Sequence, residues 1–305
     1  MIANLFNTSK PFNTLIIIFL LILLYSISFI NSVDVKIDLI EFLKTLMVFL
    51  ALIVTFFMVN FIVRKNGLSK DNSYVLFIMV LCFGMFPQSS LNYLFIIPNL
   101  ILLFAYRKIY SLRTNKDVKE KIFDSAFWIG IATLIYPWSF LFMLLIYAGI
   151  ITFNKSTIKN VIIPLIGFFT PIFIYGVFLF AIDELNNVNF RLNYNFSYLN
   201  YNSIHLLLPI TLIIGFLLWS IIPTTIKIST VNNEFKTSWS LVLFHLLISL
   251  MVGLTSVDKN GSELIFMFFP IAMIFTNYLQ MVKEKWFKDV FLYSFLAVTI
   301  TIYFL

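Results

Sequence analysis

Long apolar runs alternate with short polar segments along the whole chain. The runs are rich in Phe, Ile, Leu and Val, and many approach the roughly 20 residues that a helix needs to cross a lipid bilayer. The apolar positions within each run are continuous rather than alternating, which excludes a membrane β-barrel. The pattern predicts an all-α, polytopic transmembrane helical bundle of about 11 helices, over residues 14–30, 42–63, 74–86, 91–106, 122–136, 138–153, 161–182, 204–226, 239–254, 264–282 and 290–305.

Two of these runs, 74–86 and 122–136, are short, and each ends at a proline. Proline disfavours helical geometry in the residue before it, so a helix usually stops there. Pro87 and Pro137 are each followed at once by another apolar run. These two positions therefore predict tight helical hairpins.

The first run, 14–30, follows Lys10 and admits two interpretations. It could be a cleaved signal peptide, or it could be a first membrane helix that stays in the protein. The run is longer than the usual apolar part of a signal peptide, and Ser26-Ile27-Ser28 is a poor cleavage site. We therefore favour an uncleaved first helix.

Composition supports a membrane protein. Hydrophobic residues make up 61% of the 305 positions and charged residues only 11%, whereas a soluble domain carries about 25% charged residues. A soluble protein of this composition would expose large apolar patches and aggregate. Residues 1–305 are therefore predicted to form a single integral membrane domain with no soluble domain. No GxxxG pair occurs, so we expect helix contacts to use Phe, Ile and Leu.

Lys and Arg are distributed unevenly between the two sets of loops. One set holds only four of them, Lys36, Lys44, Arg191 and Lys259. Positive residues stay on the cytoplasmic side, so the other set, with 17, is predicted to be cytoplasmic. This places the N-terminus inside and the C-terminus outside, and it explains the net charge of +7 without nucleic acid. The 17 are Lys10, Arg64, Lys65, Lys70, Arg107, Lys108, Arg113, Lys116, Lys119, Lys121, Lys155, Lys159, Lys227, Lys236, Lys283, Lys285 and Lys288.

Residues typical of several catalytic classes are missing. His205 and His245 are the only histidines, too few for a membrane di-iron enzyme or a histidine-bound iron oxygenase. We expect His205 and His245 to be hydrogen-bonded helix residues and Cys82, the only cysteine, to be an inert buried thiol. The chain has no P-loop, dinucleotide fingerprint, HExxH or GxSxG motif. No metal site and no organic cofactor are predicted.

Charged residues do gather in the loops that are predicted to be external. Two interpretations remain open for them. They could form a solvated rim that caps helix ends, because acidic side chains cost little free energy at helix N-termini. Alternatively, a carboxylate could act as a base, or hold a divalent cation, beside a phosphate-bearing lipid. The residues are Asp34, Asp38 and Glu41, then Asp183, Glu184 and Arg191, and finally Asp258, Lys259 and Glu263.

Three segments resemble an uncharacterised family of multi-pass inner-membrane proteins from Bacteroidota, a domain of unknown function. The likeness is carried by NLFNTSKPFN near the N-terminus, by FGMFPQSSLNYLFIIPNLILLFAYRKIYSLR over 83–113, and by KEKIFDSAFWIGIATLIYPWSFLFMLLIYAGI over 119–150. It extends over the whole chain. The resemblance implies a location in the bacterial inner membrane but no activity.

The order of elements is also similar to that of multi-pass glycosyltransferases of the GT-C type, which use polyprenyl-phosphate sugars. The acidic first external loop, FPQSS at 86–90 and GSELIFMFFPIAMIF at 261–275 carry the likeness. It implies that Asp34 or Asp38 takes the place of the catalytic external carboxylate. Departures are the very short first loop, which lacks an adjacent acidic pair, and the absence of a large external domain.

Two hypotheses of function follow. The first is a glycosyltransferase-like envelope protein, active or degenerate, with Asp34 and Asp38 as catalytic residues. Arg191, Lys259 and Glu263 would then bind the substrate, since Arg suits a bidentate phosphate contact and Lys provides a point charge. The second is a non-enzymatic membrane scaffold or accessory subunit that docks a protein partner through the basic cytoplasmic loop 107–121. Membrane lipids are expected partners in both cases.

Overall fold

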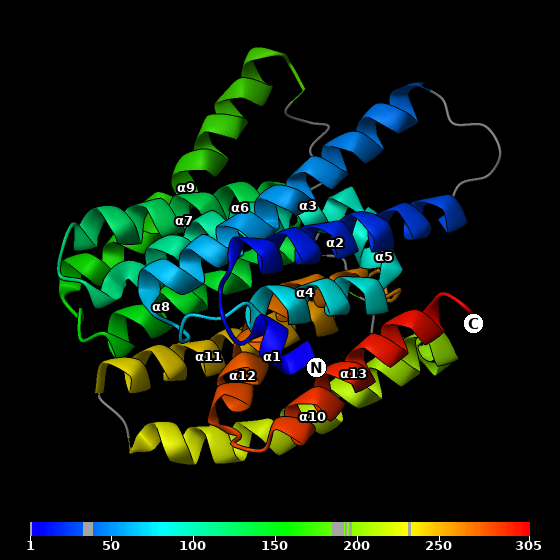
Figure 1. Ribbon diagram of the computed structural model, residues 1–305. Coiled ribbons are helices and arrows are strands. Elements are labelled where there is room, and N and C mark those ends of the chain that lie inside the picture. Colours follow the sequence, from blue (N-terminus) through cyan, green and yellow to red (C-terminus); the bar gives the residue numbers. More distant parts are fainter. Residues whose placement is uncertain (1, 33–38, 185–191, 193, 195–196, 231–232) are drawn as a thin grey trace.

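The computed structural model describes residues 2–32, 39–184, 192, 194, 197–230 and 233–305. Helices make up 85% of the structure, and no strand occurs in these ranges, which confirms the all-α class. The helices lie side by side in a bundle (Figure 1). They are α1 (Ile2–Phe6), α2 (Pro11–Ser32), α3 (Leu39–Asn66), α4 (Tyr74–Met85), α5 (Pro87–Leu91), α6 (Tyr93–Tyr110), η1 (Ser111–Arg113), α7 (Val118–Ile135), η2 (Pro137–Phe142), α8 (Met143–Thr152), α9 (Ile158–Ala181), η4 (Leu199–Asn202), α10 (Ile204–Ser229), α11 (Asn233–Thr255), η5 (Ser262–Leu264), α12 (Ile265–Met281) and α13 (Lys285–Ile302).

Every predicted apolar run coincides with a helix, but the runs differ in their capacity to cross a membrane. Within the described ranges, 7 helices are long and apolar enough to do so. These are α2, α3, α6 continued by η1, α9, α10, α11 and α12 preceded by η5. Helices α4 and α8, the latter extended by η2, are shorter, while α7 and α13 carry charged residues. The count of about 11 spanning helices therefore stays a prediction.

The two predicted proline turns are confirmed. Helix α4 ends at Met85 and α5 begins at Pro87, while α7 ends at Ile135 and η2 begins at Pro137. The residue before each proline, Phe86 or Tyr136, has left the helical region, with φ near −125° in both cases. The proline ring forces that departure and then suits the first position of the next helix.

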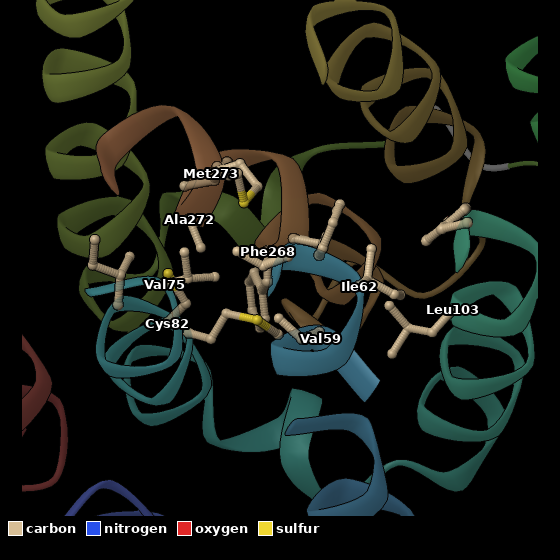
Figure 2. Close-up of a cluster of buried hydrophobic side chains, with 14 of the residues drawn as sticks. Val59, Ile62, Val75, Cys82, Leu103, Phe268, Ala272 and Met273 are labelled. Atoms are coloured by element: carbon tan, nitrogen blue, oxygen red, sulfur yellow. The ribbon is translucent and has the colours of Figure 1, made fainter. Parts of the chain in front are cut away.

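Helices α4 and α12 form the centre of the bundle. All 12 residues of α4 are buried, as expected for a helix that is apolar on every face. Helix α12 is nearly as enclosed. Figure 2 shows side chains from both helices meeting neighbours from α3 and α6, and Cys82 is fully buried among them, as predicted. The labelled residues are Val59, Ile62, Val75, Cys82, Leu103, Phe268, Ala272 and Met273.

Helices α7 and α9 approach each other closely through one glycine on each. A Cβ atom on Gly130 would lie 2.6 Å from the carbonyl oxygen of Phe168. A Cβ atom on Gly167 would lie 2.7 Å from the carbonyl oxygen of Phe123 and 2.9 Å from Cβ of Ala126. The expectation that large apolar residues make the helix contacts is therefore wrong at this crossing. Single small residues on separate helices allow the backbone approach that a GxxxG pair would otherwise provide.

The loops that carry most of the Lys and Arg residues meet at one end of the bundle, the basic end. Hydrogen bonds join them in pairs, including Ser9 to Asp71, the Lys70 amide to the Gln280 side chain, and Lys227 Nζ to the Met281 carbonyl oxygen. The described parts of the remaining loops lie at the opposite end, which we call the outer end. The described loop residues are thus grouped as the sequence predicts, while the assignment of the two ends to cytoplasm and exterior rests on the charge asymmetry.

Candidate functional site

The predicted site residues fall into two groups. Asp34, Asp38 and Arg191 lie outside the described residues, so their roles stay predictions. Lys259 and Glu263 are described, and both lie at the outer end between α11 and α12. Both side chains are almost completely buried, with 2% of Lys259 and 0% of Glu263 exposed. Neither therefore belongs to a solvated rim of charges.

Glu263 lies in the short η5 helix that leads into α12. Its Oε1 atom accepts a hydrogen bond from the hydroxyl group of Tyr201, in η4. Burial, and next the negative charge of Glu263, raise the pKa of Tyr201, which therefore keeps its proton and remains a donor. The other carboxyl oxygen, Oε2, is buried and has no hydrogen-bond partner among the described residues, and the same holds for the hydroxyl group of Ser262. The cluster therefore retains unused capacity to bind a polar group.

Lys259 closes the end of α11. Its Nζ atom donates to the carbonyl oxygens of Gly253 at 3.0 Å and Leu254 at 2.7 Å, in the last turn of the helix. The ammonium group also lies 4.9 Å from the centre of the Tyr198 ring, a favourable cation–π position. Burial lowers the pKa of Lys259, and the nearby charge of Glu263 opposes that shift.

The backbone between these two side chains is constrained. Gly261 has a backbone φ of +91°, a value that residues with a side chain rarely adopt. A Cβ atom there would also lie 3.0 Å from side-chain atoms of Phe86 and Leu206. The Asn260 side chain accepts a hydrogen bond from the Ser262 amide at 3.0 Å, which closes a local turn. The loop is thereby pressed against the end of α4 and the start of α10.

A groove of about 540 Å³ opens beside this cluster; we call it the outer groove. Its polar part includes Lys259, Asn260, His205 and Gln88. Its apolar part is formed by Met85, Phe86, Pro87, Leu199, Leu206 and Ile302. None of the described lining residues is acidic, so the groove itself offers donors and one cation but no carboxylate base. The arrangement suits an amphipathic ligand with an anionic head group.

The other external acids do not converge on this groove within the described part of the chain. Glu41 lines a separate groove of about 280 Å³ with Lys44, Leu91 and Tyr93. Asp258 is exposed. Asp183 and Glu184 are exposed at the end of α9, whose last turns project from the bundle as do the first turns of α3 (Figure 1).

The two histidines have different surroundings. His245 is fully buried in α11, and its Nδ1 atom lies 3.2 Å from the Tyr110 hydroxyl oxygen, which confirms the predicted hydrogen-bonded helix histidine. Aromatic rings of Tyr106, Phe142 and Phe269 surround it. His205 is exposed and lines the outer groove. Among the residues that the structure describes, no group of three or more His, Cys, Asp or Glu side chains could hold a metal ion.

Two residues that contact the buried cluster, Tyr198 and Tyr201, are not among the site residues predicted from the sequence. Both belong to loop 183–203, which is rich in Asn and Tyr, whereas the candidate site residues in that loop are charged. Their hydroxyl groups contact Glu263 and the Leu254 carbonyl oxygen, which are distant in sequence. The density of Tyr in this loop, which the sequence predicts to be external, is the available signal, because Tyr combines an apolar ring with a polar tip at the membrane boundary.

Apolar helices around a buried polar cluster define the class of the protein: it is all-helical, with several helices long and apolar enough to cross a membrane. The chain belongs to the family described as "Family of unknown function (DUF6427)", which matches residues 1–305. This confirms the resemblance to an uncharacterised family over the whole chain. No curated protein and no solved structure matches the chain.

Proposed function

We propose that the protein is a multi-pass inner-membrane protein of the bacterial cell envelope that binds a polyprenyl-phosphate lipid at its outer end, in the manner of a GT-C type glycosyltransferase. The observation that carries this proposal is the outer groove, where an apolar wall adjoins Lys259 and neutral polar groups. A polyprenyl phosphate has the same two parts, an apolar chain and an anionic head. The groove faces the exterior if the basic end is cytoplasmic.

Lys259 is the residue best suited to the phosphate. An ammonium group has three donors, and Gly253 and Leu254 use two of them, so one remains for a ligand. His205 and the amide groups of Gln88 and Asn260 add hydrogen-bond donors nearby. The prenyl chain would lie along Phe86, Leu206 and neighbouring apolar residues.

The transfer step of the proposal uses the carboxylates that precede α3. Asp34 or Asp38 removes the proton from an acceptor hydroxyl group, whose oxygen forms a bond to the sugar carbon. The bond from that carbon to the phosphate oxygen breaks, and its electron pair leaves with the polyprenyl phosphate. Arg191, Lys259 or a divalent cation offsets the charge that develops on the leaving phosphate. A degenerate member would bind the lipid without this step.

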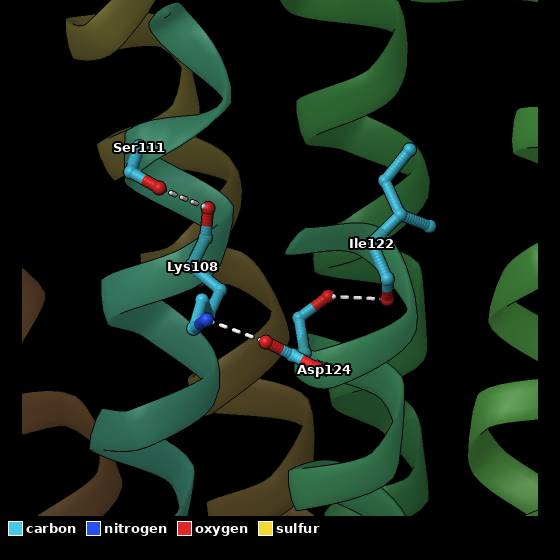
Figure 3. Close-up of polar contacts among 5 residues, drawn as sticks. Lys108, Ser111, Ile122 and Asp124 are labelled. Carbon is cyan, nitrogen blue, oxygen red and sulfur yellow. Dashed lines mark hydrogen bonds and ion pairs between the residues drawn. The ribbon is translucent and has the colours of Figure 1, made fainter. Parts of the chain in front are cut away.

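A scaffold that docks a protein through loop 107–121 is the second candidate. Much of this loop is already bonded within the chain: Lys108 forms an ion pair with Asp124 at 2.5 Å (Figure 3), and Lys121 donates to the Ser111 carbonyl oxygen and the Thr114 hydroxyl group. Lys116 and Lys119 remain exposed and would make the contact with a partner. Because Lys108 and Lys121 are already bonded within the chain, this loop supports the scaffold less well than the groove supports lipid binding.

Replacing Lys259 by Gln is expected to weaken binding of undecaprenyl phosphate about 10- to 100-fold, the range of one hydrogen bond to a charged group. Native mass spectrometry of the purified full-length protein in mild detergent would measure this. His205→Ala, an exposed change that leaves the α11 end intact, is expected to weaken binding less.

Lys44→Gln is the matched control, because it removes one positive charge from the separate groove at the same end. It should bind undecaprenyl phosphate as the unchanged protein does. The assignment of the groove would be contradicted if uncharged undecaprenol bound as tightly as undecaprenyl phosphate. Equal losses of affinity in the Lys44 and Lys259 variants would also contradict it.

A further inference from the structure

A polar pocket lies at the basic end, where α3 ends. It has a volume of about 300 Å³, and its polar lining includes Arg64, Lys70, Asn60, Asn72 and Asp71. The Asp71 carboxylate also accepts a hydrogen bond from the Ser9 hydroxyl group. Within the described ranges, neither Arg64 nor Lys70 forms an ion pair with a carboxylate. The pocket therefore presents two cations against one carboxylate.

A narrow apolar seam continues from this pocket between α2 and α3. The pocket and the seam are neighbours, because Asn60 and Leu76 line both. On α3 the seam follows Phe57 and Ile53, and on α2 it follows Thr14, Ile17, Ile18 and Leu21. Such spacings of three or four residues keep each set on one face of its helix.

The seam has the length of one leaflet. Arg64 and Ile53 belong to the same helix, and the rise of 1.5 Å per residue places them ~16 Å apart along its axis. Half of the hydrocarbon core of a bilayer is about 15 Å thick. A chain anchored at Arg64 would thus reach the middle of the membrane along the seam.

We propose that Arg64 and Lys70 bind the head group of an anionic glycerophospholipid from the leaflet at the basic end, with one acyl chain along the seam between α2 and α3. Basic pockets between membrane helices on the cytoplasmic side favour anionic lipids. The seam encloses only about 20 Å³, so the acyl chain lies against it from the lipid side and is covered by the surrounding lipid. A free phosphate ion would gain nothing from the apolar seam, and a zwitterionic lipid carries no net charge for the cations. This site is at the opposite end from the outer groove and does not depend on it.

Native mass spectrometry of the full-length protein with dioleoyl phosphatidylglycerol tests this proposal. Replacing both Arg64 and Lys70 by Gln is expected to weaken binding roughly 30-fold, from about fivefold per cation near the surface. Dioleoyl phosphatidylethanolamine is expected to bind more weakly than phosphatidylglycerol, and millimolar inorganic phosphate is expected not to compete. The side chains of Arg64 and Lys70 are both exposed, so the double variant should fold normally.

The matched control replaces Lys65 and Lys119 by Gln, two exposed cations at the same end that do not line the pocket. Its affinity for phosphatidylglycerol should stay within about threefold of the original. An equal loss in both double variants would show general attraction to the basic end and overturn the site. Unchanged binding after loss of Arg64 and Lys70, or displacement by inorganic phosphate, would also overturn it.

A second change, Ile18→Trp, should weaken phosphatidylglycerol binding by filling the seam while leaving the pocket cations in place.

Discussion

Replacing Asp34 or Asp38 by Asn is expected to reduce sugar transfer from a polyprenyl-phosphate donor by about 10²- to 10⁴-fold, the usual contribution of a general base. Asn keeps the size and polarity of Asp but does not accept a proton, so the change tests charge rather than packing. Both positions lie in the short loop before α3 and should contribute little to folding. The measurement is transfer of radiolabelled sugar by the purified protein, with membrane expression as a check on folding.

Asp258→Asn provides the matched control, because Asp258 is an exposed acid at the same end that does not line the outer groove. It should retain full transfer. If the Asp34 and Asp38 variants both retain full function, the enzyme hypothesis fails. Loss of function on replacing Lys116 and Lys119 by Ala would then favour the scaffold hypothesis.

Replacing Gly167 by Leu is expected to destabilise the protein by about 3 kcal/mol, the upper part of the range for overpacking. The added side chain would meet the carbonyl oxygen of Phe123, and a helix backbone moves less readily than a side chain. Helices α7 and α9 would have to separate at their closest approach. The measurement is the midpoint of thermal unfolding in detergent, which should fall by several degrees.

Gly176→Leu is the control on the same helix, because a Cβ atom at that position would meet nothing within 4 Å. Its midpoint should stay unchanged or rise slightly, since Leu favours helix more than Gly does. Equal destabilisation by the two changes would show that the cost arises within α9 and not at its contact with α7.

Local features of the fold could be predicted because they depend on neighbouring residues. The run 264–282 corresponds to Ile265–Met281 of α12, and the prolines at 87 and 137 end the preceding helices through their own ring geometry. The close approach of α7 and α9 at Gly130 and Gly167 could not be predicted, because it depends on how two helices cross. The absence of a sequence motif within one helix says nothing about a pair of glycines on two.

The candidate site, like the fold, could be predicted only where local sequence decides it. Lys259 and Glu263 stood out as charged residues in an external loop, which local sequence can show. Their burial could not be foreseen, because it requires Tyr201, 62 positions away from Glu263, and the end of α11 to close over them. The relation of Asp34, Asp38 and Arg191 to the outer groove stays a prediction, since these residues lie outside the described ranges.

The proposed orientation places the outer groove at the exterior and the basic end in the cytoplasm. Single cysteines at positions 116 and 200, in a Cys82→Ser background, test it directly with a thiol reagent that does not cross membranes. Lys116 lies in the basic loop, and Asn200 lines the outer groove. In intact spheroplasts we expect labelling at position 200 and, until the membrane is disrupted, none at position 116. Labelling at position 116 with protection at position 200 would contradict the orientation and, with it, both proposed lipid sites as assigned to their leaflets.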